Sequence, residues 1–340
     1  MPMKIAVDAM GGDHAPAEVI KGALQVARDA EEVQIVLIGD ETAIRAVLDA
    51  QEDVPDGVTV RHASQAVAMG EHPVQATRRK RDSSLVVAGM MVKSGEADAT
   101  FSAGNTGAAM AIATLDIGRI PGIDRPAIGS CIPTIRGQAL LLDAGANVDC
   151  SPRNLLQFAL LGAIYSERVL KVRNPKIGLL NIGAEEGKGN DLTKEVHRLL
   201  RATPLNFQGN VEGKDVFEHA VDVVVCDGFA GNVLLKSGEG MAEMVFDLLQ
   251  REVDADPLIA ESLDAILPIF RRVTQRVHYS EFGAAPLLGA NGASFIGHGR
   301  SNAKAIAGGL RTVITAAGSG YVQAIREALP GFESKAESKA

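Results

Sequence analysis

The chain has 340 residues, of which 46% are hydrophobic and 22% charged, and its formal net charge is -8. This composition supplies a large core and excludes global disorder. Aromatic residues make up 4% and Trp is absent, which together with the acidic balance argues against a general nucleic-acid binder. An anionic substrate would have to be attracted by local positive fields.

The cysteines and the first residues bear on the compartment. Cys131, Cys150 and Cys226 are widely spaced and form no C-x-x-C, which argues against a disulfide framework or a zinc site. The N-terminus enters a strand directly, so we expect no signal peptide. No run of about 18 apolar residues occurs, so we expect no membrane span. These features predict a cytoplasmic protein.

Short apolar runs, typical of buried strands, alternate with amphipathic stretches, typical of helices. In chain order, strands are predicted at residues 4–8, 33–38, 58–62, 99–101, 128–132, 139–143, 176–182, 205–207 and 221–227, and helices at 15–30, 41–50, 83–94, 106–116, 153–172 and 191–202. The alternation predicts a single domain over residues 1–330, a three-layer α/β/α fold with a mostly parallel sheet. Ligands of such sheets bind beyond the carboxyl ends of the strands.

The pattern changes after Asn232. A long helix is predicted over residues 233–253, and residues 254–282 continue helical, so that a helical hairpin spans about 233–282. Its apolar tip contains Leu263, Ile266, Leu267, Ile269 and Phe270 and is followed by Arg271, Arg272 and Arg276. Two interpretations stay open: the hairpin packs in a dimer interface or on the sheet, or its tip dips into a membrane surface with arginines on lipid phosphates. A closing helix is predicted over 301–329, and the polar tail 331–340 is expected to be disordered.

Four stretches have the pattern strand, Gly/Asn-rich turn, helix, at residues 7–14, 102–107, 143–147 and 227–232. Glycine lets backbone N–H groups approach a ligand, and the following helix directs its positive end at the same point. No turn carries a cysteine or a Gly-x-Ser-x-Gly nucleophile elbow. The turns therefore predict a site that holds and polarises an anion. Its phosphate-binding or substrate-binding candidates are Gly11, Gly12, Asp13, His14, Gly104, Thr106, Gly107, Asp227, Gly228 and Gly231.

Polar side chains in the turns are the catalytic candidates. The Asp8 carboxylate would orient other groups, and the amides of Asn105, Asn147 and Asn232 would stabilise a developing oxyanion without carrying charge. His14 could bind phosphate or protonate a leaving group. For Asp13 and Thr106, helix capping is the alternative.

Lysines and arginines supply the remaining candidates, with Lys188 as a catalytic residue that reaches phosphate and Lys236 as a phosphate ligand. Lys188 lies between glycines in residues 181–190, and Lys236 lies one helical turn beyond Asn232. The Lys188 segment lacks the P-loop pattern, and a solvated surface lysine is the alternative at both positions. The run Arg78, Arg79, Lys80 and Arg81 either docks an acidic partner, joins Ser83 and Ser84 in holding phosphate, or is a solvated face. The turns Arg125-Pro126 and His298-Gly299 remain without an assigned role.

Taken together, the motifs resemble the phosphate acyltransferase family called PlsX from Met3 to about Leu329. The motifs are Asp8-Ala9-Met10-Gly11-Gly12-Asp13, Arg81-Asp82-Ser83-Ser84, Ser102-Ala103-Gly104-Asn105-Thr106-Gly107, Asp124-Arg125-Pro126-Ala127, Leu142-Asp143-Ala144-Gly145-Ala146-Asn147, Asn181-Ile182-Gly183 with Lys188-Gly189, Gly209-Asn210-Val211-Glu212-Gly213, Asp227-Gly228-Phe229-Ala230-Gly231-Asn232 and Ala285-Pro286-Leu287-Leu288-Gly289. One departure is Phe282-Gly283-Ala284, where the family usually has Tyr-Gly-Gly.

The resemblance implies an isocitrate/isopropylmalate-dehydrogenase-like fold, a homodimer, and peripheral membrane contact by the hairpin. It implies that acyl-carrier-protein thioester and inorganic phosphate give acyl phosphate and free carrier protein, the first step toward phosphatidic acid in bacterial phospholipid synthesis. Bound phosphate would attack the thioester directly, with no cofactor or metal. The expected partners are the acyl carrier protein, docked at Arg78–Arg81 or at Arg271, Arg272 and Arg276, and the downstream glycerol-3-phosphate acyltransferase.

Three other functions are weighed against this one. A phosphotransacetylase-type enzyme using acyl-coenzyme A shares the chemistry but leaves the apolar hairpin unexplained. A nicotinamide-dependent decarboxylating dehydrogenase would need a cluster of metal-binding carboxylates. A non-enzymatic scaffold for lipid enzymes is the third alternative.

Overall fold

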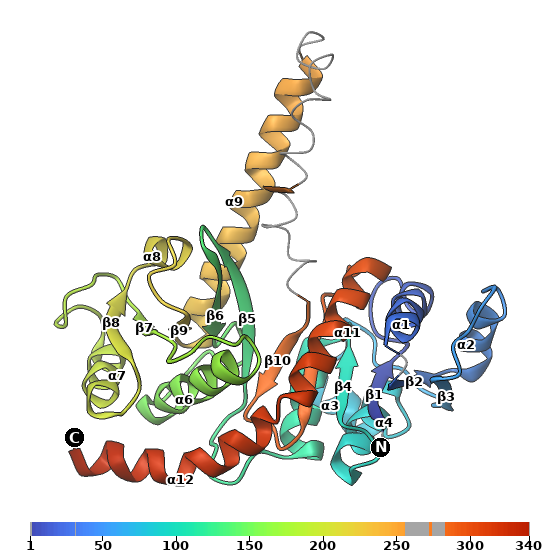
Figure 1. The fold of residues 1–340 in the computed structure, drawn as a ribbon, viewed down its shortest axis with the longest axis horizontal. Helices are drawn as coiled ribbons and strands as arrows, with labels where there is room; N and C mark the ends of the chain where they lie inside the picture. The colour runs from blue at the N-terminus through green and yellow to red at the C-terminus, as the bar shows by residue number, and fades with distance from the viewer. Residues whose placement is uncertain (1, 31, 256–271, 274–282, 340) are drawn as a thin grey trace.

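The computed structural model describes residues 2–30, 32–255, 272–273 and 283–339 (Figure 1). Eleven strands form one sheet in the order β3-β2-β1-β4-β11-β10-β5-β6-β9-β7-β8. Their bounds are β1 Met3–Asp8, β2 Val33–Gly39, β3 Val58–His62, β4 Ala99–Ser102, β5 Ala127–Thr134, β6 Gly137–Leu142, β7 Ile177–Leu180, β8 Phe207–Val211, β9 Val223–Val225, β10 Ala285–Leu288 and β11 Ala293–Ile296. All nine predicted strands are present, and β10 and β11 are additional.

The sheet is mostly parallel, as predicted, but its two halves run in opposite directions. Strands β2, β1, β4 and β11 pair in parallel, and so do β6, β9, β7 and β8. Between these halves, β10 is antiparallel to β11 and to β5, and β5 is antiparallel to β6. Three consecutive reversals leave the second half opposite to the first. The alternation of strands and helices in the sequence did not reveal this.

Most helices begin at side-chain caps that the sequence supplies. Asp40 accepts a hydrogen bond from the Thr42 N–H, and Asn190 and Asn302 cap α7 and α11 in the same way. The bounds are α1 Ala17–Asp29, α2 Glu41–Leu48, α3 Pro73–Arg79, α4 Ser84–Ser94, α5 Thr106–Ile112, α6 Pro152–Arg168, α7 Asp191–Ala202, α8 Gly213–Phe217, α9 Gly228–Ala255, α11 Ala303–Gly318 and α12 Tyr321–Lys339, with a π-helical turn at Ala113–Ile117. Helices α3 and α8 were not predicted.

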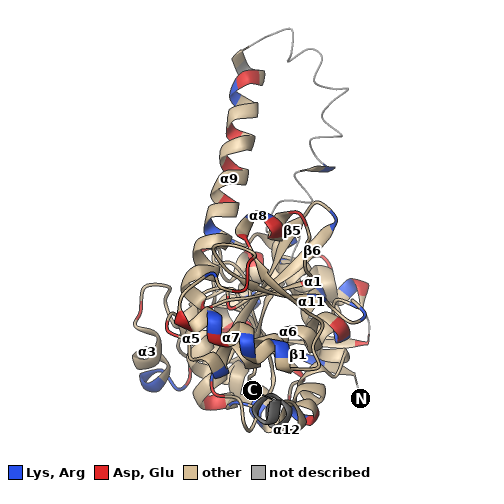
Figure 2. Cartoon of the chain, turned by 90° about the vertical axis from the view of Figure 1, so that its left-hand side faces the viewer, with Lys and Arg blue, Asp and Glu red and all other residues tan. Residues whose placement is uncertain are grey.

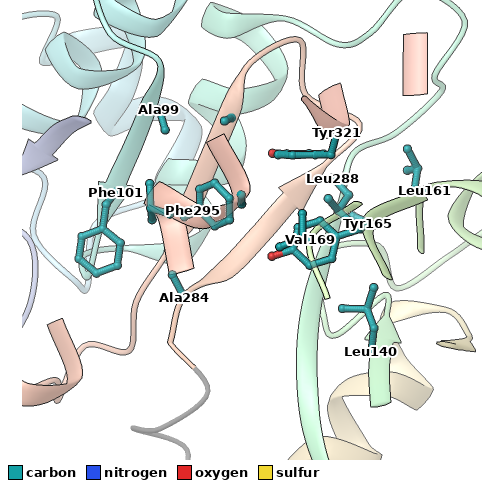
Figure 3. Packing of buried hydrophobic residues seen from close by; sticks show 14 of the residues in the cluster. Ala99, Phe101, Leu140, Leu161, Tyr165, Val169, Ala284, Leu288, Phe295 and Tyr321 are labelled. Atoms are coloured by element: carbon teal, nitrogen blue, oxygen red, sulfur yellow. The ribbon is translucent and has the colours of Figure 1, made fainter. Parts of the chain in front are cut away.

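Helices cover both faces of the sheet and so complete the predicted three layers. On one face, strand residues such as Ile5 and Val7 pack with α1, α6, α7, α11 and α12 in one continuous core. There the Tyr165 and Tyr321 rings meet edge to face at a centroid separation of 5.5 Å (Figure 3). On the other face, smaller clusters place α4 and α5 over the first half of the sheet and α8 and α9 over the second.

Helix α9 has 28 residues and projects from the body as an arm (Figures 1 and 2). It is the first helix of the predicted hairpin. The predicted tip residues Leu263, Ile266, Leu267, Ile269 and Phe270, together with Arg271 and Arg276, lie outside the described residues, whereas Arg272 is helical and exposed. No helix in the described part of the chain is long and apolar enough to cross a bilayer.

The C-terminal segment differs from its prediction. The single closing helix predicted over 301–329 is two helices, α11 and α12, separated at Ser319 and Gly320, and Gly320 has a left-handed φ of 69°. Helix α12 then continues to Lys339. The tail expected to be disordered from residue 331 is therefore helical up to Lys339, and its beginning is anchored because Phe332 is buried in the main core.

Candidate active site

Three adjacent parallel strands, β1, β4 and β11, end in turns that are bonded to one another. The Asp13 N–H donates to the Gly299 carbonyl at 2.8 Å, and the Gly297 N–H donates to the Ser102 carbonyl at 2.8 Å. A Cβ on Gly11 would lie 2.5 Å from Asp8 Oδ2 and 2.8 Å from the Gly104 nitrogen, so this close approach requires glycine. We call residues 8–14, 102–107 and 297–300 the first cradle.

The Asp8 carboxyl lies buried beneath the first cradle. The Ser102 hydroxyl donates to its Oδ2 at 2.7 Å, and the Met10 N–H donates to its Oδ1 at 3.2 Å. Burial raises the pKa of Asp8, against the opposing effect of hydrogen bonds from Ser84 and Ser102. Ser83 and Ser84 are buried as well, so these predicted phosphate ligands face the protein interior. Asp8 thus binds groups of two turns of the first cradle, at Met10 and at Ser102.

The raised pKa of Asp8 predicts how stability depends on pH. The folded chain holds the Asp8 proton above the ordinary pKa of 3.8, where the unfolded chain has released it. The contribution of Asp8 to the free energy of unfolding should therefore fall as pH rises from about 4 through the folded pKa. Urea unfolding of the wild type and Asp8→Asn at several pH values measures this. The wild type should lose stability relative to Asp8→Asn as pH rises, and parallel curves would contradict the assignment.

Asn105 caps α5 and holds a neighbouring loop. Its Oδ1 accepts the Ala108 N–H at 2.9 Å. Its Nδ2 donates to the carbonyls of Ala68, Met69 and Glu71 at 3.3, 3.0 and 3.1 Å. The amide is thus engaged by the protein itself, which favours a positioning role over direct donation to substrate. The other candidates near this turn, Asp13, His14 and Thr106, are exposed, and Gly107 is half-buried against Pro73.

A second cradle, residues 143–147 and 227–232, lies beyond β6 and β9. The buried Asp143 carboxylate accepts the backbone N–H groups of Ile128, Gly145, Ala146 and Asn147 and the Asn147 Nδ2, at 2.6–3.2 Å. Sequence analysis did not single out Asp143 as a site residue. It organises this turn as Asp8 organises the first.

Helix α9 begins directly against the second cradle. The Gly228 N–H donates to the Asn147 carbonyl at 2.7 Å, and Asp227 Oδ1 accepts the Ala230 N–H at 2.8 Å. Asn147 is buried and also donates to the Pro126 carbonyl at 2.8 Å. Asn232 is exposed on the first turns of α9. Of these two amides, Asn232 is therefore the one that faces solvent.

Lys188 lies in a loop beyond β7, the strand beside β9. The Asn181 Nδ2 donates to the Lys188 carbonyl at 3.1 Å, and the Asn210 Nδ2 donates to the Glu185 carbonyl at 2.8 Å. These bonds fix the loop, and the Lys188 side chain is exposed. The loop therefore belongs to the same edge of the sheet as the second cradle.

The turns do not all follow strands that run in one direction, because the second half of the sheet is reversed. Twist partly compensates for the reversal. Six strand steps separate β1 from β9, and at about 20–25° per step they rotate the strand direction by about 120–150°. A rotation of this size would turn the carboxyl end of β9 toward the side on which β1 ends.

Lys236, on α9 beyond the second cradle, acts electrostatically on the first cradle. The Lys236 charge acts on the His298 imidazole of the first cradle, as do the charges of Glu239 and Asp13. Partial burial first, and then the Lys236 cation, lower the pKa of His298. Lys236 is itself paired with Glu239 at 2.7 Å. The exposed start of α9 therefore lies within electrostatic reach of the glycine turns of the first cradle.

The four residues of the basic run at the end of α3 make different contacts. Lys80 bonds to Glu71 at 2.6 Å, and Arg81 makes a two-pronged contact with Asp116 at 2.9 and 3.1 Å. Arg78 and Arg79 are exposed at the end of the helix, where Figure 2 shows basic residues on the side of the molecule. Of the four, Arg78 and Arg79 are therefore best placed to meet an acidic partner.

No cysteine thiol is activated as a nucleophile. Burial raises the pKa of Cys131 to about 12 and that of Cys150 to about 11, and it raises the pKa of Cys226 well above its ordinary value. All three thiols are thus protonated near neutral pH. Among the described residues, no group of three or more His, Cys, Asp or Glu side chains is arranged to hold a metal ion.

Comparison with known proteins shows the family to which the chain belongs. Residues 3–324 match the family model described as fatty acid synthesis protein. A phosphate acyltransferase of Desulfitobacterium hafniense (strain DSM 10664 / DCB-2) is 50% identical over 336 residues, covering 98% of this chain and 100% of the relative. The chain belongs to the phosphate acyltransferase family. A phosphate acyltransferase of Heliobacterium modesticaldum is 48% identical, and the match covers 97% of this chain and 98% of that relative. This phosphate acyltransferase is thus an enzyme of the acyltransferase class.

Solved structures support the fold of the acyltransferase. A phosphotransacetylase from Streptococcus pyogenes has a TM-score of 0.61 at 16% identity. The superposition covers 93% of this chain and 94% of the phosphotransacetylase chain. A 4-hydroxythreonine-4-phosphate dehydrogenase from Klebsiella pneumoniae has a TM-score of 0.54 at 13% identity, with 93% and 100% covered. At such identities the likeness concerns the fold alone.

Proposed function

We propose that this phosphate acyltransferase transfers the acyl group of an acyl-carrier-protein thioester to inorganic phosphate, the first step toward phosphatidic acid. The observation that carries the proposal is the position of the start of α9, where Asn232 lies beside Gly145 of the second cradle and the Lys236 charge acts on His298 of the first cradle. Backbone N–H groups at glycine turns and helix starts bind anions. The same donors stabilise the oxyanion of a tetrahedral intermediate.

The reaction needs no group of the enzyme to become acylated. A phosphate oxygen attacks the thioester carbonyl, the new C–O bond forms, and the C–S bond breaks with its electron pair leaving on sulfur. The proton of hydrogen phosphate ends on the departing thiolate, giving free carrier protein. The protonated cysteines support direct attack by phosphate. Lys188, Asn232 and Lys236, which are exposed beside the turns, are the proposed ligands of phosphate or of the carbonyl oxygen.

The test of this function is release of free thiol from acyl-carrier protein in the presence of inorganic phosphate, with acyl phosphate as the product. Acyl-coenzyme A at the same concentration is the comparison substrate. We expect faster release from the carrier-protein thioester. Transfer from acyl-coenzyme A alone would instead support a phosphotransacetylase-type enzyme, and acyl-enzyme formed without phosphate would contradict direct attack.

Arg78 and Arg79 are the proposed docking residues for the acidic carrier protein. Reversing both charges, Arg78→Glu with Arg79→Glu, should raise the KM for the carrier-protein substrate about three- to tenfold, because each exposed charge contributes modestly. The effect should shrink at high salt. Arg173→Glu with Lys176→Glu, also exposed but far along the chain, is the control. If both double variants raise this KM equally, the change in net charge explains the effect, and Arg78 and Arg79 are not a docking site.

We propose that a second copy of the chain packs on the arm. Helix α9 exposes large apolar side chains at helical spacing, which is typical of a face that another helix covers. The exposed residues are Phe229, Val233, Met241, Met244, Val245, Leu248 and Leu249. The homodimer is supported by this face and by the resemblance described above.

Peripheral membrane contact through the hairpin is the last part of the proposed function, and it would bring the product to a membrane-bound glycerol-3-phosphate acyltransferase. Leu267→Glu with Phe270→Glu should abolish binding to anionic phospholipid vesicles, because two charges would enter the apolar interface. Activity on soluble substrate should persist. Sedimentation with vesicles measures the effect, and vesicle binding equal to that of the wild type would exclude the hairpin as the anchor.

A further inference from the structure

We propose that Asn210 and His197 are positioning residues that hold Lys188 where its ammonium group binds the attacking phosphate. The proposal rests on the proposed function above, in which Lys188 is a ligand of phosphate or of the carbonyl oxygen, and deepens it. The sequence motif at residues 209–213, which contains Asn210, has no role in that function so far. The structure places Asn210 on β8, whereas Lys188 lies in the loop at residues 181–190 that follows the neighbouring strand β7.

A single backbone carbonyl connects Asn210 to Lys188. The Asn210 Nδ2 donates to the Glu185 carbonyl at 2.8 Å, and the Lys188 N–H donates to the same carbonyl at 3.1 Å. A carbonyl oxygen has two lone pairs and can accept both bonds. The Lys188 carbonyl accepts the Asn181 Nδ2 at 3.1 Å. Both backbone groups of Lys188 are therefore held, and Asn210 acts on one of them through the oxygen that they share.

The side chain of Lys188 packs against the backbone just beyond β7. A Cβ on Gly183 would lie 3.0 Å from Lys188 Cγ and 3.4 Å from its Cδ. Strand β7 pairs in parallel with β9, the strand that leads into the second cradle. The aliphatic stem thus lies at the edge of the sheet that carries this cradle, and the residue remains exposed. Fixing the Lys188 backbone therefore also limits where its ammonium group can lie.

His197 determines how the Asn210 amide is oriented. The two side chains are 6% and 7% exposed, so solvent does not compete for their bond. Because Nδ2 of Asn210 donates to a carbonyl, Oδ1 is the atom that faces His197 Nδ1 at 3.0 Å, and Oδ1 can only accept. The ring therefore carries a proton on Nδ1, while its Nε2 accepts the Arg201 Nε–H at 3.4 Å. All bonds from Arg201 to the loop thus run in one direction.

Rigid elements hold the His197 ring itself. The ring lies edge to face against Phe207 of β8 at a centroid separation of 5.2 Å. The Arg201 guanidinium lies 5.9 Å from the centre of the same Phe207 ring and pairs with Glu186 of the loop at 3.0 Å. Helix α7 and strand β8 therefore grip the loop at Glu185 and Glu186, two to three residues before Lys188.

Asn210→Leu removes the amide without changing the net charge. We expect the Kd for inorganic phosphate to rise about 3- to 10-fold, the size of a coupling within one hydrogen-bond network. Asn206→Leu is the matched control. The Asn206 Nδ2 also donates to a backbone carbonyl, that of Asn174 at 2.9 Å, but it precedes β8 and lies at the opposite end of that strand. This control should keep the wild-type Kd. Titration of inorganic phosphate followed by phosphorus NMR, without acyl substrate, measures both.

Two variants of His197 separate positioning from packing. In His197→Asn, the amide nitrogen takes the place of Nδ1 and can donate to Asn210 Oδ1. In His197→Gln, the amide lies at the position of Nε2, and Asn210 loses its donor. Both variants lose the ring that packs on Phe207, so a merely structural role predicts equal effects. We expect the Kd for phosphate to rise about threefold in His197→Gln and to stay near the wild-type value in His197→Asn.

A double-mutant cycle tests whether Asn210 acts through Lys188. Lys188→Ala alone should raise the Kd for phosphate about 10- to 100-fold, the range for loss of one hydrogen bond to a charged group. Adding Asn210→Leu to Lys188→Ala should raise the Kd no further, because the group that Asn210 positions is already gone. The loss of stability in urea caused by Asn210→Leu should be the same with and without Lys188.

Several outcomes overturn the inference. Additive effects of Asn210→Leu and Lys188→Ala on the Kd would do so, and so would a wild-type Kd in Asn210→Leu. If Asn210→Leu fails to fold, the two His197 variants decide, and equal Kd values in them overturn the proposal. A wild-type Kd in Lys188→Ala removes Lys188 as a phosphate ligand and the inference with it. The proposed function fails separately, if the wild type releases no thiol from acyl-carrier protein, because the phosphate titrations contain no acyl substrate.

Discussion

Replacing Gly231 with alanine is expected to abolish acyl transfer and to lower the free energy of unfolding by about 3 kcal/mol or more, at or above the upper end for overpacked sites. An added Cβ would lie 1.9 Å from the Asp143 carbonyl oxygen and 2.9 Å from Cys226 Sγ. The backbone at Asp143 cannot easily move away, because the Asp143 N–H donates to the Cys226 carbonyl, just beyond the end of the neighbouring strand. Helix α9 would have to shift, and with it Asn232 and Lys236.

Gly240→Ala is the matched control for this prediction. Gly240 lies on the same helix, and nothing lies within 4 Å of its added Cβ. Alanine should stabilise that position by about 1 kcal/mol through helix propensity. Urea unfolding and thiol release measure both variants. Should Gly231→Ala unfold at the wild-type urea concentration with normal activity, the packing of α9 against the second cradle would not matter for the reaction.

The second large effect is expected for Asp143→Asn. The carboxylate is fully buried and accepts five N–H groups, three on Oδ1 and two on Oδ2. In an asparagine, one oxygen is replaced by an NH2 group, so at least two N–H donors lose their acceptor in either orientation. At about 1–3 kcal/mol for each unsatisfied buried group, the free energy of unfolding should fall by about 2–6 kcal/mol.

Turnover should fall in parallel in Asp143→Asn, because residues 145–147 lose the group that holds their N–H bonds together. Asp53→Asn provides the comparison. The Asp53 side chain is 78% exposed, and its carboxylate lies 3.9 Å from Arg28, so its replacement should change stability by less than about 0.5 kcal/mol. Equal stability of the two variants in urea would show that the Asp143 carboxylate does not organise the turn.

The three predicted asparagines show how much residue type alone can predict about a site. Asn105, Asn147 and Asn232 each follow a glycine turn, and sequence analysis treated them alike. In the structure, the Asn105 amide is engaged by carbonyls of residues 68–71, the Asn147 amide by Pro126 and Asp143, and Asn232 is exposed. The partners lie up to 37 residues away in the chain. Local sequence contains no record of such contacts.

Strands β10 and β11 illustrate the same limit for the fold. Each has four residues, and β10 contains Pro286. Runs this short carry no clear periodicity, and proline is uncommon inside strands. Their place between β4 and β5 comes from pairing with neighbours distant in sequence. They introduce two of the three reversals that separate the turns into two cradles.

Sequence alone predicts local features, namely nine strands, most of the helices and the glycine turns that lie beyond strand ends, because apolar periodicity, caps and glycine act within a few residues. The direction of the second half of the sheet, the engagement of Asn105 and Asn147, and the approach of Lys236 to His298 were decided by the tertiary structure. These features depend on strand pairing, sheet twist and charges that meet across the fold, which no short stretch of sequence encodes.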